Sequence, residues 1–228
     1  LGNKTMSSFS DSKAISGYAE NAIRRVPGLK DIHRMSALLM AERTPPGGRV
    51  LIVGAGGGME LSYFAETFPD WKFDGVDPSR EMLDLAKTNL GSLASRVQLH
   101  CGYIEAAPEE LFDAASCLLT LHFTNEAERY RTLCEIHARL KPGGALVTAH
   151  YSIPQNPTER ELWLSRCAEF AILSGISSEQ AKTSLAAIGK QLPILTPQQD
   201  EELMQKAGFS DINTFYVGLG FRGWVAYA

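Results

Sequence analysis

The sequence predicts an α/β fold: a seven-stranded, mostly parallel sheet with an antiparallel last strand, helices on both faces and a helical insertion after the fifth strand. Three observations support this prediction. Short apolar segments alternate with segments of helical periodicity between residues 49 and 150, and a glycine-rich turn directly follows the first apolar segment. Two strand-like segments close the chain with no helix between them. The alternation indicates parallel strands joined by helices, and the close terminal pair requires antiparallel strands.

The first half of this pattern contains four predicted strands and two helices. Arg49–Val53 is short, apolar and rich in β-branched residues, which is typical of a buried parallel strand. Apolar residues at helical spacing predict a helix over Met59–Phe68. The other predicted elements are strands at Trp71–Val76, Val97–Cys101 and Ala114–Leu121, and a helix at Glu81–Leu90.

The second half begins with a predicted helix, Glu126–Leu140, which Lys141-Pro142-Gly143-Gly144 should end because these residues are helix stop signals. Ala145–His150 is the predicted fifth strand. A threonine cap, a proline and a glutamine at positions 196–199 predict the start of a helix that ends at Gly208. Two further strands are predicted at Ser210–Val217 and Phe221–Ala228.

Length and composition indicate one domain. The chain has 228 residues, of which 44% are hydrophobic, enough for one substantial core. We expect residues 1–5, before Met6, to be an expression remnant and residues 6–228 to form a single domain with an N-terminal helical cap at 6–45. No apolar run reaches membrane-spanning length and no signal core is recognisable, so the chain is predicted to be soluble and cytoplasmic.

Net charge and cysteine content limit the classes of ligand and partner that the chain is expected to bind. The net charge is −4 and lysine and arginine are not clustered, so direct nucleic-acid binding is not expected and a small-molecule substrate is favoured. The four cysteines show no C-x-x-C spacing and no pairing with histidine, so neither a metal site nor a disulfide framework is predicted.

The glycine turn Gly54-Ala55-Gly56-Gly57-Gly58 lies between a predicted strand and a predicted helix. Glycine there allows a ligand to approach the backbone and the amides of a helix N-terminus. A P-loop needs a Gly-Lys-Ser/Thr ending, which is missing. The dinucleotide pattern G-x-G-x-x-G would require a third glycine at Met59. The pattern that remains is G-x-G-x-G (Gly54, Gly56 and Gly58), which is typical of loops that bind S-adenosylmethionine (SAM).

Asp77 follows the second predicted strand. A carboxylate at that position can accept hydrogen bonds from both ribose hydroxyls of a nucleoside lying across the strand ends. Alternatively, Asp77 caps the helix that begins near Arg80.

Three segments in order resemble class I SAM-dependent methyltransferases, which have a Rossmann-like fold. They are Leu51–Gly58, the turn Val76-Asp77-Pro78-Ser79 with Met82 after it, and Leu140–Val147. The resemblance covers roughly residues 15–228 and implies SAM as cofactor, with S-adenosylhomocysteine (SAH) as its product.

Within that superfamily the chain is similar to the carboxy-SAM synthases that serve tRNA wobble-uridine modification. The shared segments are Val26-Pro27-Gly28, Leu121–Val147, Ala207-Gly208-Phe209 and Phe215–Ala226. The chain departs from that family at four cofactor or substrate positions. Leu203 replaces a carboxylate-binding arginine, Leu29 a tyrosine, Leu118 an asparagine and Tyr103 an aspartate.

The resemblance implies a role for each cofactor-binding position. Gly54, Ala55 and Gly56 line the methionine part of SAM and Asp77 holds the ribose. Pro78 and Met82 pack on the adenine, and Tyr103 and Ile104 flank its edge. Leu118, Leu119 and Thr120 lie nearest the sulfonium. Many relatives have an acidic residue two positions before the first glycine, where this chain has Ile52.

Methyl transfer requires an aligned nucleophile and the exclusion of water, and some acceptors also need a base to remove a proton. His150 and Tyr151 end the fifth predicted strand and His122 follows the fourth, so all three are candidate catalytic residues at the cleft. Alternatively, they are ordinary polar residues at strand ends.

The segment Asn156–Leu195 is the predicted insertion. Its apolar stripe predicts a helix that packs on the core, on a second subunit or over the acceptor as a lid, and we expect Gly175–Gln191 to be a mobile loop. The family resemblance implies a homodimer formed through this region. The stripe consists of Leu162, Trp163, Cys167, Phe170, Ala171 and Leu173.

Three functions follow from the sequence. The first is methyl transfer to an unidentified small molecule by in-line displacement. The second is formation of a SAM derivative, as in carboxy-SAM synthases, which incubation with SAM and prephenate would detect. The third is a SAM- or SAH-binding domain without catalysis.

Overall fold

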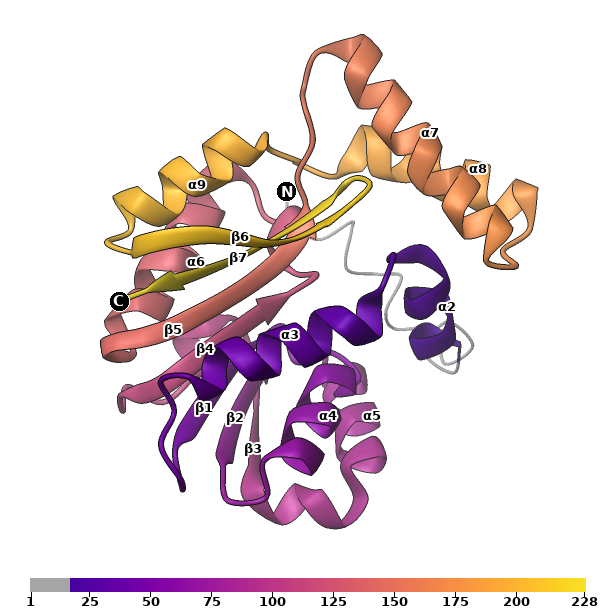
Figure 1. The fold of residues 1–228 in the computed structure, drawn as a ribbon. Coiled ribbons are helices and arrows are strands. Elements are labelled where there is room, and N and C mark those ends of the chain that lie inside the picture. Colours follow the sequence, from indigo (N-terminus) through magenta and orange to yellow (C-terminus); the bar gives the residue numbers. More distant parts are fainter. Residues whose placement is uncertain (1–16) are drawn as a thin grey trace.

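The computed structural model describes residues 17–228. The expected expression remnant at 1–5 and the first part of the expected cap, residues 6–16, lie outside the described residues. The centre of the described chain is a seven-stranded sheet in the order β3-β2-β1-β4-β5-β7-β6 (Figure 1). Its strands are β1 (Arg49–Val53), β2 (Lys72–Asp77), β3 (Val97–Cys101), β4 (Phe112–Leu118), β5 (Leu140–Tyr151), β6 (Ser210–Gly218) and β7 (Phe221–Tyr227).

The sheet topology confirms the predicted fold class. β1 pairs in parallel with both β2 and β4, and β2–β3 and β4–β5 are also parallel pairs. β7 inserts between β5 and β6 and is antiparallel to both. The order of the strands reverses between β1 and β4, which therefore flank the switch point of the sheet.

Helices cover both faces of this sheet. Successive side chains of a strand point to opposite faces, and in the central strands both sets are apolar and need to be buried. In β1, Val50 and Ile52 pack with α3, α4 and α5, whereas Leu51 and Val53 pack with α6 and α9. Figure 1 shows these two helical layers on opposite sides of the sheet. The helices are α2 (Tyr18–Arg25), α3 (Leu29–Ala41), α4 (Met59–Thr67), α5 (Arg80–Leu90), α6 (Glu126–Ala138), α7 (Pro157–Leu173), α8 (Ser178–Gln191) and α9 (Pro197–Lys206). Short 3₁₀ turns occupy Gly91–Arg96, Ile104–Ala106 and Leu121–Phe123.

Strand β5 begins earlier than the sequence predicts. Leu140–Gly144 was expected to end a helix and form a turn, but this segment is the bulged start of β5, and α6 ends at Ala138. Two long-range interactions hold it in the sheet. Gly143 N donates to the carbonyl of Ala228, and Lys141 Nζ lies 2.7 Å from Asp113 Oδ1.

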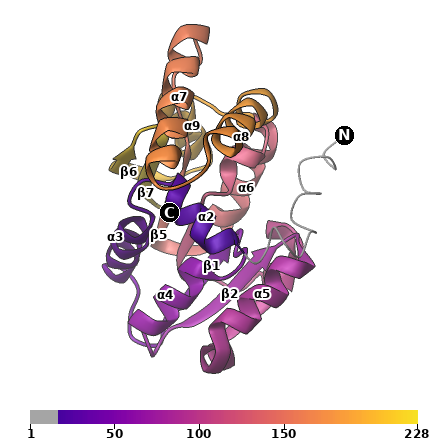
Figure 2. The same ribbon diagram turned by 90° about the vertical axis from the view of Figure 1, so that its right-hand side faces the viewer.

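The insertion after β5 is a helical hairpin of α7 and α8, which projects beyond the sheet (Figures 1 and 2). Residues 175–191 were expected to be a loop, but most of them form α8, which Ser177 caps through Gln180 N. The predicted stripe is only partly buried. Cys167 and Ala171 lie in the interior, but Leu162 is 45% exposed and Leu173 is 87% exposed. No helix within residues 17–228 is long and apolar enough to cross a membrane.

Candidate functional site

A cavity of about 670 Å³ opens beside the carboxyl ends of β1, β2 and β4. Open α/β sheets bind ligands at this switch point, and the volume is typical of small-molecule sites, which occupy about 300–1,000 Å³. One side of the cavity is the glycine loop with the ends of β2 and β4. Its other side includes residues of α2 and α3, the last residue of α8 and the segment that follows it, namely Ala22, Leu29, His33, Gln191 and Pro193.

The glycine loop needs glycine at each alternate position. Gly54, Gly56 and Gly58 have φ values of 78°, 48° and 78°, in the left-handed region that other residues rarely adopt. Space is limiting as well, because a Cβ on Gly54 would lie 2.0 Å from Thr120 Oγ1. The loop therefore presents bare backbone to the cavity.

Asp77 holds this loop in place. Its Oδ2 accepts a hydrogen bond from Gly56 N at 2.9 Å, and its Oδ1 accepts one from Ser79 N at 2.9 Å. The cap of α5 is Ser79, whose hydroxyl accepts from Met82 N, so Asp77 is not that cap. Burial raises the pKa of Asp77, against the opposing effect of the hydrogen bonds from Ser79 and Gly56.

The cavity brings together eleven of the twelve residues expected to bind the cofactor. The exception is Gly58, which caps α4 and does not line the cavity. A Cβ on Gly58 would lie 3.0 Å from Ala86 Cα, so this glycine permits close packing of α4 on α5. The eleven are Gly54, Ala55, Gly56, Asp77, Pro78, Met82, Tyr103, Ile104, Leu118, Leu119 and Thr120.

The end of β4 is strained where it meets the cavity. Leu119 has a φ of 54°, a conformation that costs a residue with a side chain about 1–3 kcal/mol. The Leu119 amide donates to the carbonyl of Ala149 at 2.6 Å, and Thr120 Oγ1 donates to the Leu118 carbonyl at 2.9 Å. These bonds hold the turn in place and direct Leu119 and Thr120 to the cavity wall.

The three candidate catalytic residues do not face the cavity, contrary to expectation. His150, His122 and Tyr151 are all buried, and none of them lines it. His150 Nε2 lies 3.3 Å from Asp200 Oδ1. Tyr151 packs on the Phe221 ring with centroids 4.0 Å apart, and burial raises its pKa.

His122 is also placed as a structural residue. Its Nδ1 accepts a hydrogen bond from Tyr151 N at 3.4 Å. Burial, followed by the charges of His150 and Arg129, lowers the pKa of His122 well below its ordinary value. A neutral, buried imidazole of this kind matches the structural alternative considered for these residues.

The sequence reasoning missed the two buried ionisable residues of the cavity wall, Glu60 and His33. Glu60 lies in the first turn of α4 and is 8% exposed, and its Oε1 has no hydrogen-bond partner. His33 on α3 is 6% exposed, and burial lowers its pKa to about 4, so its imidazole is neutral at physiological pH. A glutamate next to the glycine loop, on the apolar side of α4, was the available signal for Glu60. His33 lies far from the loop in sequence and gave no signal.

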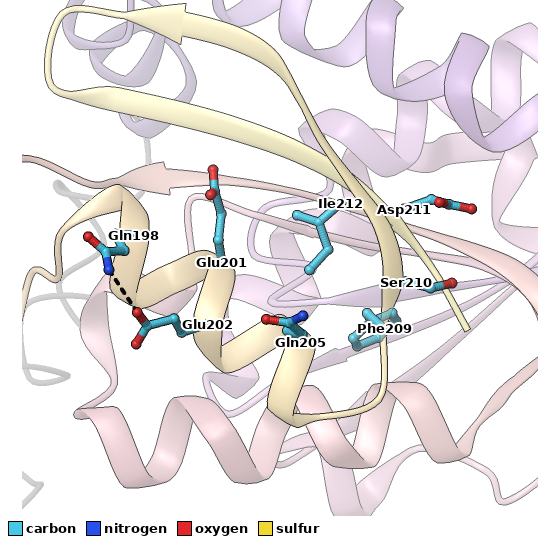
Figure 3. A pocket seen from close by; sticks show the side chains of 8 residues that line it. All are labelled: Gln198, Glu201, Glu202, Gln205, Phe209, Ser210, Asp211 and Ile212. Atoms are coloured by element: carbon cyan, nitrogen blue, oxygen red, sulfur yellow. Dashed lines mark hydrogen bonds between the residues drawn. The ribbon is translucent and has the colours of Figure 1, made fainter.

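A second hollow of about 300 Å³ lies between α9 and β6 and shares no residue with the glycine-loop cavity (Figure 3). Two of the carboxylates that line it already have partners in the protein. Glu201 Oε1 accepts from Trp224 Nε1 at 2.9 Å, and Glu202 Oε1 accepts from Gln198 Nε2 at 2.9 Å. Among residues 17–228, no three His, Cys, Asp or Glu side chains are grouped so that they could hold a metal ion.

Comparison with known sequences finds similarity to methyltransferases and related enzymes. Residues 50–144 match a family model described as a methyltransferase domain. The chain is 23% identical to a carboxy-S-adenosyl-L-methionine synthase of Idiomarina loihiensis, over 95% of this chain and 91% of the relative.

Solved structures share the fold. An O-methyltransferase family protein from Burkholderia thailandensis superposes with a TM-score of 0.70 at 15% identity and covers 100% of this chain. The cyclase SpnF superposes with a TM-score of 0.57 at 25% identity and covers 80% of this chain. The chain spans only 63% of the first of these proteins and 59% of the second.

Proposed function

The chain contains a class I SAM-dependent methyltransferase domain, and on that premise we propose that it transfers the methyl group of SAM to a small, mostly apolar acceptor. The observation that carries this proposal is the single cavity that joins the glycine loop to a chamber formed by α2, α3 and the segment after α8. The residues expected to bind the cofactor line one side of this cavity, and the other side is available to a second molecule.

The cavity residues fit SAM on three counts. The left-handed glycines leave backbone exposed where a Cβ would block the loop. Asp77 offers the lone pairs that its two backbone hydrogen bonds leave free to a ribose. Glu60 has an oxygen without a partner. When bound, SAM supplies an activated methyl group on a sulfonium, for which SAH is the leaving group.

The contribution of the protein is alignment and exclusion of water. Leu118, Leu119 and Thr120 line the cavity at the end of β4, and Leu29 and His33 line it from α3. A nucleophile held between these two walls sheds most of its water, which raises its reactivity toward the methyl carbon.

We assign His33 as the polar contact for the acceptor. It replaces His150, His122 and Tyr151 in that role, because it lines the cavity and they do not. Its neutral ring can accept a hydrogen bond from an acceptor hydroxyl or amine and so orient the lone pair that attacks.

The test is a screen with methyl-labelled SAM and a panel of phenols, amines and carboxylic acids, with products read by mass spectrometry. Active acceptors should lose turnover in His33→Leu and retain it in Lys30→Ala, an exposed control on the same helix. Binding of SAH without labelled product from any acceptor would favour a non-catalytic binding domain instead.

Formation of a SAM derivative is the second candidate, because the curated relatives that match most of this chain are carboxy-SAM synthases. The lining of the cavity argues against it. Arg131 is its only arginine or lysine among the described residues, and that side chain is 67% exposed and paired with Glu105. Leu203, at the position of the family's carboxylate-binding arginine, is buried in the core. Incubation with SAM and prephenate should therefore yield no carboxymethyl sulfonium product.

We also propose a cytoplasmic homodimer of one domain over residues 6–228, with 156–195 as the insertion that contacts the acceptor or a second subunit. The four cysteines are free, in keeping with a reducing compartment. Leu162 and Leu173 expose apolar surface on α7. Sedimentation should give twice the 24.9 kDa chain mass. Leu173→Glu should yield monomers and Leu38→Glu, an exposed leucine on α3, should not.

A further inference from the structure

Glu60 is a buried carboxyl group without a protein counter-charge. It lines the cavity beside the glycine loop, is 8% exposed, and its Oε1 has no hydrogen-bond partner. None of the ion pairs among the described residues includes it. An unpaired carboxylate is costly to bury, so the site favours either a proton on Glu60 or a cation brought in by the ligand.

The neighbouring charges strengthen that preference. Burial raises the pKa of Glu60 to about 8, its own backbone amide opposes this, and the negative charge of Asp77 adds to it. The thiol of Cys117, from β4, is the other titratable group that interacts with Glu60. The remaining charged or titratable side chains that line the cavity are His33, Tyr103, Glu105, Glu128 and Arg131. The wall near the loop therefore carries two acids, Glu60 and Asp77.

This chain lacks the acidic residue that many members of the family it resembles have just before the glycine loop. The position two residues before the first glycine is Ile52, which is fully buried in the apolar core. We propose that the carboxylate of Glu60, from the first turn of α4, pairs with the α-ammonium of the methionine part of SAM and so replaces the acid missing at Ile52. This inference rests on the binding of SAM along the glycine loop.

Coupled protonation follows from this pairing. Near neutral pH the empty site holds Glu60 mostly protonated, because its pKa is about 8. An arriving ammonium favours the ionised carboxylate, so binding releases a proton. Affinity for SAH should therefore rise with pH up to about 8, and the part of this rise that Glu60 causes should be absent for a ligand that lacks the ammonium.

The experiment compares two ligands by calorimetry: SAH, and 5′-methylthioadenosine, which has the nucleoside and thioether without the amino acid. Glu60→Gln should weaken SAH about tenfold to a hundredfold and leave 5′-methylthioadenosine within twofold. Glu66→Gln, an exposed control on the same helix, should change neither. Titrations of the wild type with SAH at pH 7, in buffers of different ionisation enthalpy, should show release of nearly one proton.

Unchanged SAH affinity in Glu60→Gln overturns the proposal, and so does an equal loss for both ligands, which would indicate a structural role. The wild-type proton release decides the matter if the variant does not fold, because its absence excludes the ionisation of Glu60. Failure of the wild type to bind either ligand would instead reject the cofactor site itself.

Discussion

Replacement of Asp77 tests the cofactor site most directly. Its two oxygens already accept from Gly56 N and Ser79 N, each at 2.9 Å. A carboxylate has about four acceptor positions, so each oxygen retains one for a ribose hydroxyl. Asp77→Ala therefore removes the ribose contacts and also releases the glycine loop.

The expected loss is large enough to measure. Hydrogen bonds to a charged group contribute about 1.5–3 kcal/mol, which corresponds to roughly a 10-fold to 150-fold weaker complex. Since SAH and 5′-methylthioadenosine share the ribose, Asp77→Ala should weaken both by similar factors, unlike Glu60→Gln. Isothermal titration of each ligand into wild type, Asp77→Ala and the exposed control Asp84→Ala provides the comparison.

The pH dependence supplies a second readout. Because burial raises the pKa of Asp77, its carboxylate takes up a proton at a higher pH than an exposed aspartate would. A protonated Asp77 accepts fewer hydrogen bonds, so the affinity for 5′-methylthioadenosine should fall as the pH is lowered through that pKa. A folded Asp77→Ala protein with wild-type affinity for both ligands would refute the ribose assignment.

Three further predictions concern the loop, the core and the insertion. Gly56→Val should abolish measurable SAH binding, because valine resists the φ of 48° at this position; wild-type affinity by calorimetry would contradict this. Arg129→Met should lower the free energy of unfolding by about 3–5 kcal/mol in urea melts, because it strands the buried Asp200 carboxylate, whereas the exposed Arg131→Met should cost about 0–1 kcal/mol. Burial raises the pKa of Asp200, but the interactions of its carboxylate with His150 and Arg129 lower it more. The stability that the Arg129–Asp200 pair provides is therefore present at neutral pH and is lost as the pH falls through the pKa of Asp200 in the folded protein. Trp163 is only partly buried, so Trp163→Ala should lower the free energy of unfolding by about half of the 3–5 kcal/mol expected for a core tryptophan. The loss should be the same with and without SAH.

The fold was predictable because its signals are local. The central strands β1 and β4 and the second part of β5 show short, mostly apolar runs, and each of the predicted strand centres lies within the observed strand. The capping box of Thr196 and Gln199 was visible as sequence and is present at the start of α9. The antiparallel last strand followed from the short connection between β6 and β7.

The errors arose where tertiary contacts override local preference. Lys141-Pro142-Gly143-Gly144 has the composition of a helix stop, yet it joins β5 because the end of the chain and Asp113 supply its partners. Residues 175–191 were expected to be a mobile loop. They form α8 because α7 offers a face to pack on, and Leu164 of α7 lies within 3.5 Å of where a Cβ on Gly189 would be.

The candidate site also contains residues that the sequence could predict and residues that it could not. The residues of the strand ends and glycine loop line the cavity because the topology of a parallel sheet fixes where they lie. His150 was expected there by its position near the end of β5, but the side chains of a strand point to the faces of the sheet, and His150 packs against Trp224 and Asp200 instead. His33 reaches the cavity only through the packing of α3, which no local pattern records.

The departures from the carboxy-SAM synthase pattern form a consistent chemical change. Leu29 and Leu118 line the cavity with apolar surface at positions where that family's pattern implies a tyrosine and an asparagine. Leu203 is withdrawn into the core, so no cation replaces the family's arginine there. An anionic co-substrate entering such a chamber would lose hydration and would meet no buried arginine or lysine among the described lining residues, since Arg131 is exposed and paired with Glu105, so its burial would cost several kcal/mol. A neutral nucleophile would lose little hydration, and the neutral imidazole of His33 can orient it. The lining of the chamber therefore supports the proposal of methyl transfer to an uncharged acceptor over that of carboxylate chemistry.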